Sequence, residues 1–364
     1  MAEKLNVKNT LNLPLTSFAM KASLAQMAWL AVFVVSLLGH ALLSAQGSPQ
    51  ARPTLPPPDQ PALSAQDKTE IAEVLKLKAE AGDEVWPGLA AADLPIILFN
   101  ARYEFLVGAA NPPGPWEILK DQSFQGKPYN RRSADNPQNF AVKVGIAYAG
   151  SASTLGLMNS KGPMKLGPDF HVVLVLHEIF HAYQADQDAA RFDRALAVYK
   201  VEKNYPFQDK DMAAAWVTEG AALAQALKAP TYEEAVRLAQ KFLEIRDARR
   251  GAARLSPELA DYERELEWLE GLAKYAEVRF YELAASRADQ TASIKFNPGL
   301  PFFLQWDFVR LEKQMGTQKG DLRFYLSGMA QARLLDRLSP DWKSRTALGK
   351  VYLEGLLRSA TSKK

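Results

Sequence analysis

Residues 172–187 read Val-Val-Leu-Val-Leu-His-Glu-Ile-Phe-His-Ala-Tyr-Gln-Ala-Asp-Gln. The apolar pattern predicts one helix over 168–187. His177 and His181 are four residues apart, so a helix places both imidazoles on one face, one turn apart. The run of five apolar residues before His177 indicates that this helix is buried.

The pair of histidines has the spacing of a metal site. Two neutral imidazoles one helical turn apart can share a Zn²⁺ ion at about 2.0–2.1 Å each. Glu178 is then placed to act as a general base, which takes a proton from a water that the metal activates and passes it to the leaving amine. The chain has only four histidines, and His40 lies in an N-terminal apolar segment. The alternative is a pair of helix histidines that hold no metal.

A catalytic zinc site needs a third protein ligand beside water. In metzincins this ligand follows the second histidine by six residues, but position 187 is Gln187, so that pattern is excluded. Two later glutamates remain as candidates. Glu219 lies in the segment Trp-Val-Thr-Glu-Gly-Ala-Ala (216–222), and Glu270 lies in Trp-Leu-Glu-Gly-Leu-Ala-Lys-Tyr (268–275).

These segments together resemble the gluzincin metallopeptidases, such as the thermolysin-like and aminopeptidase-type enzymes. The resemblance covers residues 170–280 and implies a zincin-like fold, zinc-dependent peptide hydrolysis and a glutamate from a later helix as third zinc ligand. Glu219 matches the Trp-x-x-Glu-Gly-x-Ala spacing and is favoured. Glu270 matches a second version of the segment, with its tryptophan one position closer, and stays open as the alternative.

Other polar residues have weaker signals. Tyr275 is a candidate catalytic residue that would stabilise the oxyanion, with simple packing as an equal alternative. We expect His171, Tyr325 and Asp336 to be structural. Charged residues recur at helical spacing in the expected helix over 256–287, which is typical of a solvated face. These residues are Glu263, Glu267, Glu270, Lys274 and Glu277. We expect arginines of the preceding helix to form structural ion pairs with them, namely Arg246, Arg249 and Arg250.

Composition limits the function further. The chain has 364 residues, 48% of them hydrophobic, with 44 Lys+Arg against 41 Asp+Glu. This balance does not favour nucleic acid as a partner, because no basic cluster interleaves with aromatic residues. The absence of cysteine excludes disulfides, a thiol nucleophile and cysteine-ligated zinc.

The N-terminal region indicates export. Residues 1–45 combine lysines, an apolar run and the small-residue pattern Ala45-Gln46-Gly47, which is the layout of a bacterial signal peptide or an uncleaved signal anchor. Met20 is an alternative start. Residues 46–66 form a proline-rich linker, and 67–364 form the expected zincin-like metallopeptidase domain. Both readings place this domain outside the cytoplasm, in the periplasm or secreted, with any membrane contact through the N-terminal segment.

Periodicity predicts an α+β fold, with a small N-terminal sheet region followed by a mostly helical body. We expect strands within 95–107 and 140–148 and a polar loop over 127–138. We expect helices over 67–82, where Gly82 ends the helix, and over 168–187, 211–228, 231–250, 256–287, 301–314, 321–338 and 341–359.

Together these features predict an exported zinc metallopeptidase that acts on a peptide or protein substrate. One alternative is a catalytically inactive binding protein with a zincin fold, although such a protein would have no need of Glu178. Another is a zinc hydrolase of a non-peptide amide or ester, because the same activated water serves both reactions.

Overall fold

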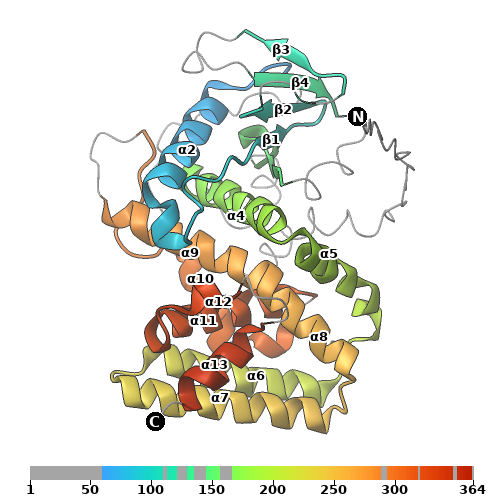
Figure 1. Cartoon of the computed structure of the whole chain (residues 1–364), viewed down its shortest axis with the longest axis vertical. Coiled ribbons are helices and arrows are strands. Elements are labelled where there is room, and N and C mark those ends of the chain that lie inside the picture. The colour runs from blue at the N-terminus through green and yellow to red at the C-terminus, as the bar shows by residue number, and fades with distance from the viewer. Residues whose placement is uncertain are drawn as a thin grey trace, which may run out of the picture.

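The computed structural model describes residues 60–109, 112, 114–120, 129–134, 145–155, 166–287, 293–318, 320–346 and 351–362. The expected signal segment and most of the linker lie outside these residues. The fold is α+β, as expected. Figure 1 shows a small sheet with α2 at one end of the molecule, α4 beneath the sheet, and the remaining helices in a body below.

The first helix, α2 (Ala65–Val85), starts earlier and ends later than expected. The Ser64 side chain caps it and forms a capping box with Asp67. Leu63 is buried, so the end of the predicted linker belongs to the folded domain. Gly82 does not end the helix. It lets the backbone of Ala90 approach, because a Cβ at Gly82 would lie 2.7 Å from the Ala90 nitrogen.

The sheet has five strands in the order β3-β4-β2-β1-β5. The hairpin of β1 (Ile96–Phe99) and β2 (Tyr103–Val107) confirms the two strands expected over 95–107, and β5 (Ala147–Gly150) pairs parallel to β1 at the sheet edge. The expected loop over 127–138 is wrong where it is described, because β4 (Tyr129–Ser133) pairs with β2 and with β3 (Glu117–Leu119). The arginine-rich sequence of β4 concealed this strand, since its arginines face partners on neighbouring strands instead of following a simple apolar alternation.

Helix α4 (Pro168–Gln187) lies at the junction between the sheet and the helical body. Its side chains are buried on nearly all sides, which is typical of an inner helix. It packs against β5, α2 and α9. His171 ties these parts together, because its two ring nitrogens face Glu70 of α2 and the carbonyl of Gly150 in β5.

The helical body follows α4. The expected helix over 256–287 is interrupted by a π-helical turn, Glu267–Gly271, and the expected C-terminal helix is two helices. A helix and a 3₁₀ turn (Val198–Asn204) after α4 were not expected. The helices are α5 (Ala189–Ala197), α6 (Lys210–Lys228), α7 (Tyr232–Ala252), α8 (Pro257–Leu266), α9 (Leu272–Ser286), α10 (Phe302–Lys313), α11 (Leu322–Leu338), α12 (Trp342–Thr346) and α13 (Leu353–Ser362).

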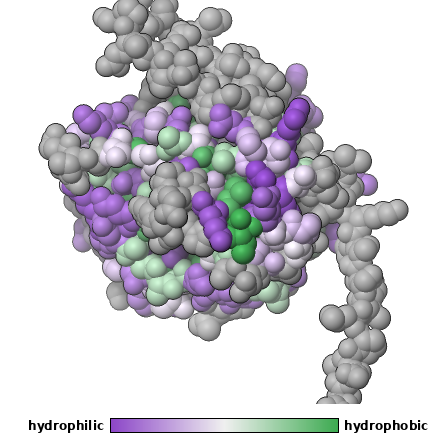
Figure 2. All heavy atoms as spheres, turned by 90° about the horizontal axis from the view of Figure 1, so that it is seen from above, coloured by the Kyte–Doolittle hydropathy of each residue, from purple (hydrophilic) through white to green (hydrophobic). Residues whose placement is uncertain are grey.

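The described surface offers little apolar area. Seen from the sheet end, it is mainly hydrophilic with a narrow hydrophobic strip (Figure 2). Ile118 and Tyr232 are the large hydrophobic side chains that are clearly exposed among the described residues. Within the part of the chain that the structure describes, no helix has both the length and the apolar character needed to span a membrane.

The π-helical turn and α11 approach each other through two glycines. A Cβ on Gly271 would lie 2.5 Å from the Cα of Gly328 and 3.0 Å from the carbonyl oxygen of Phe324. Both neighbours are backbone atoms, so α11 and the π-helical turn would have to move apart to make room for a Cβ atom at this position. Glycine at position 271 therefore sets the distance between α11 and the segment that carries Glu270.

We expect Gly271→Ala to lower the free energy of unfolding by about 1–3 kcal/mol, because the added methyl overpacks a backbone contact. Gly251→Ala is the matched control. It replaces a glycine in α7 that has no atom within 4 Å of its Cβ position, so it should raise stability by up to about 1 kcal/mol. Urea unfolding of both variants measures the two effects. Equal effects of the two substitutions would contradict the close contact at Gly271.

Candidate metal centre

Three side chains from two distant parts of the sequence converge. His177 and His181 come from α4, and Glu270 comes from the π-helical turn between α8 and α9. Their ligand atoms all lie within 4.8 Å of one another. The four-residue spacing therefore brings the two imidazoles together on one face of α4, as expected, and the tertiary fold adds the carboxylate of Glu270.

The distances within this group suit a small divalent cation. The two histidine Nε2 atoms are 3.1 Å apart, and Glu270 Oε2 lies 3.2 Å from His181 Nε2 and 3.9 Å from His177 Nε2. A point equidistant from the corners of this triangle lies about 2.0 Å from each, which matches zinc bonds to imidazole and carboxylate.

Each histidine is oriented by an acceptor on its far side. Nδ1 of His181 lies 2.9 Å from Oε1 of Gln184, and Nδ1 of His177 lies 3.3 Å from Oε2 of Glu277. The hydrogen bond to Gln184 favours the proton on Nδ1 of His181 and leaves its Nε2 lone pair directed at the centre, as in metal sites. The contact of His177 with Glu277 is an electrostatic one, because its Nδ1 does not meet hydrogen-bond geometry among the described residues. Gln184 is itself held, because its amide donates to the carbonyl of Trp268.

The carboxylate behind His177 is fixed by buried charges. Lys274 donates to Glu277 at 2.7 Å and lies 2.7 Å from Asp307 of α10. All three side chains are buried. Burial opposes ionisation of Glu277, but Lys274 and His177 hold its pKa below its ordinary value. Glu277 is therefore an anion that steadies the imidazole, and the sequence-based expectation of a solvated stripe on this helix is wrong for all its members.

Two tyrosines surround Glu270. The hydroxyl oxygen of Tyr199 lies 3.3 Å from Glu270 Oε1 and 2.9 Å from Asp321 Oδ2, so the two carboxylates share its single hydroxyl proton. Tyr325 of α11 also hydrogen-bonds Glu270, and its ring lies parallel to that of His177 at a centroid distance of 6.0 Å. We expected Tyr325 to be purely structural. No local motif links it to the centre, because its position depends on the packing of α11 against the π-helical turn.

Glu178 lies partly buried on α4, next to the first histidine. Burial raises the pKa of its carboxyl, and the negative charges of Glu270 and Glu277 act in the same direction, while His177 and His181 oppose them. The pKa of Glu178 therefore depends on the charges of His177, His181, Glu270 and Glu277. A carboxylate with an elevated pKa has the basicity that proton transfer from water requires.

Glu219 does not join this group, which corrects the preference drawn from the sequence. Its carboxylate accepts from Arg246 Nε at 2.9 Å and from Arg249 Nε at 2.6 Å. It is 1% exposed and belongs to a buried ion-pair network between α6, α7, α8 and α13. The arginines make Glu219 a structural anion, so Glu270 takes the position of the third candidate ligand.

The same network gives the arginines of α7 the structural role expected from the sequence. Arg249 and Arg250 both bond Glu263. Burial opposes its ionisation, but these arginines lower the pKa of Glu263 to about 2. The network also contains Glu267 and Glu354, and Arg264 of α8 adds the positive charge that balances them.

The candidate oxyanion stabiliser Tyr275 is not at the centre. Its hydroxyl donates to Asp336 at 2.7 Å, and its ring packs edge-on against Trp342. The reason is helical geometry: Glu270 and Glu277 are seven residues apart and share a face, while Tyr275 precedes Glu277 by two residues and points away. Burial and Asp336 raise the pKa of this phenol. Packing is the role that its surroundings support.

We expect Glu277→Gln to weaken zinc binding by about 10–100-fold, because the amide orients His177 less strongly than an anion does. Competition with a chelator of known affinity measures this change. Glu244→Gln is the matched control, since it removes an exposed glutamate of α7 that pairs only with Lys241 among the described residues. Equal zinc affinity in both variants would show that Glu277 does not support the centre.

Comparisons of the chain with models of protein families, with curated proteins and with solved structures give no match.

Proposed function

We propose that this chain is an exported zinc-dependent metallopeptidase of the gluzincin type, which hydrolyses peptide or protein substrates. The observation that carries the proposal is the convergence of His177, His181 and Glu270 with Glu178 beside them. Two imidazoles and one carboxylate are the ligand set that leaves a fourth position on zinc for water. Export rests on the sequence of residues 1–45.

Zinc bound by this group would supply Lewis acidity and lower the pKa of water at the open position to roughly 7. The protein residues have separate tasks. Glu178 accepts a proton from the attacking water and returns it to the leaving nitrogen. Glu277 and Gln184 keep the two imidazoles in the orientation that ligation requires. Tyr199 and Tyr325 hold the carboxylate of Glu270 by hydrogen bonds.

The first experiment is elemental analysis of the purified full-length chain, beside His181→Ala. We expect about one zinc per chain in the unchanged protein and none in the variant, because two remaining ligands hold zinc weakly. Retained zinc in His181→Ala, or no zinc after reconstitution at neutral pH, would overturn the proposal. Assays with a labelled unfolded protein and with simple amide and ester substrates then separate a peptidase from a hydrolase of non-peptide bonds.

A further inference from the structure

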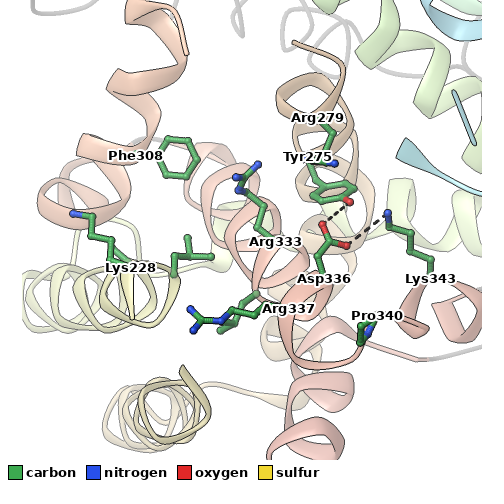
Figure 3. Close-up of a pocket in the computed structure, with 12 residues that line it drawn as sticks. Lys228, Tyr275, Arg279, Phe308, Arg333, Asp336, Arg337, Pro340 and Lys343 are labelled. Atoms are coloured by element: carbon green, nitrogen blue, oxygen red, sulfur yellow. Dashed lines mark hydrogen bonds and ion pairs between the residues drawn. The ribbon is translucent and has the colours of Figure 1, made fainter. Parts of the chain in front are cut away.

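A second group of charged residues lines a hollow of about 680 Å³ in the helical body (Figure 3). Residues of α6, α9, α10, α11 and α12 surround it. None of the residues of the metal centre is among them. Tyr275 forms part of its wall, on the side of α9 that points away from the metal centre. The hollow is therefore a separate feature of the molecule.

The lining is strongly basic. It contains five cationic side chains and one carboxylate, Asp336. Figure 3 shows three of these residues on one helix, Arg333, Asp336 and Arg337 of α11, with the others on neighbouring helices. The five cations are Lys228, Arg279, Arg333, Arg337 and Lys343.

Nearby carboxylates do not balance these charges. Glu312 pairs with Lys228 at 2.7 Å, and Asp336 lies 3.6 Å from Lys343. A single carboxylate, Glu282, serves two arginines, Arg279 at 2.7 Å and Arg333 at 2.9 Å. Arg337 donates to the carbonyl of Ala229, which carries no charge. Among the described residues, three carboxylates thus face five cations, and two positive charges remain in excess.

The local arrangement adds to this excess. Arg333 and Arg337 are four residues apart on α11, a spacing at which two like charges repel each other. Nε of Arg279 is buried and has no hydrogen-bond partner in the part of the chain that the structure describes. Burial lowers the pKa of Lys343, and the charge of Arg279 acts in the same direction while Asp336 opposes both. Charge repulsion and an unpaired buried donor both oppose folding, and such features are expected where residues serve to bind a ligand.

The hollow also has apolar wall residues, Leu227, Phe308 and Leu334. Its volume lies in the range of small-molecule sites, roughly 300–1,000 Å³, and exceeds that of a bare phosphate ion. Guanidinium groups bind phosphate through two parallel hydrogen bonds, and two excess positive charges match a phosphate monoester dianion.

We propose that this hollow binds an organic phosphate monoester, with the phosphate at Arg333 and Arg337 and the organic part against Phe308. The phosphate can belong to a soluble metabolite or to a lipid headgroup, since both present the same dianion. The proposal does not depend on the metallopeptidase function, because its residues are separate from the metal centre.

Isothermal titration of the full-length chain with phenyl phosphate tests the site, with benzyl alcohol as the neutral counterpart. We expect phenyl phosphate to bind, benzyl alcohol not to bind, and affinity to fall as the salt concentration rises. The double variant Arg333→Gln with Arg337→Gln should raise the Kd at least tenfold. Arg237→Gln, an exposed arginine of α7 paired with Glu234, should leave it unchanged.

Circular dichroism shows whether the double variant is folded, and Arg279→Gln gives a second, independent reading if it is not. Sedimentation with phosphatidic acid vesicles, compared with phosphatidylcholine vesicles, then identifies the source: vesicle binding that the double variant loses assigns the phosphate to a lipid headgroup. Absence of phenyl phosphate binding at millimolar concentration, or equal binding by the unchanged protein and the folded variants, overturns the proposal.

Discussion

Replacing Glu178 by glutamine should lower peptide hydrolysis by about 10²–10⁴-fold, the usual contribution of a general base. The amide has nearly the shape of the carboxylate but cannot accept a proton at neutral pH. Zinc content should stay near that of the unchanged protein, because Glu178 is not one of the three residues whose ligand atoms converge. The measurements are the initial rate on a fluorescently labelled unfolded protein and elemental analysis of the same samples.

Measuring both the hydrolysis rate and the zinc content makes this test specific. A variant that loses both zinc and activity would place Glu178 among the groups that hold the metal. Unchanged hydrolysis would mean that Glu178 is not the base, and it would favour a contaminating peptidase or another mechanism. Glu178→Asp provides a further comparison, since it keeps the charge and withdraws it by one methylene.

The second large effect concerns the two glutamates between which the sequence could not decide. Glu270→Gln should reduce bound zinc to background, because it removes the anionic candidate ligand that lies 3.2 Å from His181 Nε2. Glu219→Gln should leave zinc bound but lower the free energy of unfolding by about 3 kcal/mol, since it removes one partner from a buried ion-pair network. Elemental analysis and urea unfolding of both variants measure the two quantities.

Each glutamate variant serves as the control for the other, because both lose one buried negative charge. Loss of zinc in Glu219→Gln with zinc retained in Glu270→Gln would contradict the arrangement described for the centre. If Glu219→Gln fails to fold, Glu267→Gln probes the same network, because Glu267 accepts hydrogen bonds from both Nη atoms of Arg246.

The sequence alone was sufficient for the helix that carries the two histidines and for the fold class, both of which depend on local periodicity. The four-residue spacing of His177 and His181 fixes both imidazoles on one face of a helix, whatever surrounds it. The apolar run before them predicted a buried helix, and Pro168–Gln187 is its observed extent. The α+β class followed in the same way, from alternating segments before this helix and helical periodicity after it.

Features that depend on long-range pairing could not be predicted in this way. Glu219 and Glu270 stand in similar local sequences, but α7 brings Arg246 and Arg249 against Glu219 and leaves Glu270 free to meet the histidines. The strand β4 was missed for a similar reason, since its partners on other strands are not visible in its own sequence.

The chain by itself therefore determined the helix, the two histidines and the glutamate between them. Tertiary structure decided the third candidate ligand, the acceptors behind each imidazole and the removal of Tyr275 from the site. The physical reason is that helical geometry is set by residues within a turn or two, whereas the role of a buried carboxylate is set by the charges that folding brings within a few ångströms of it.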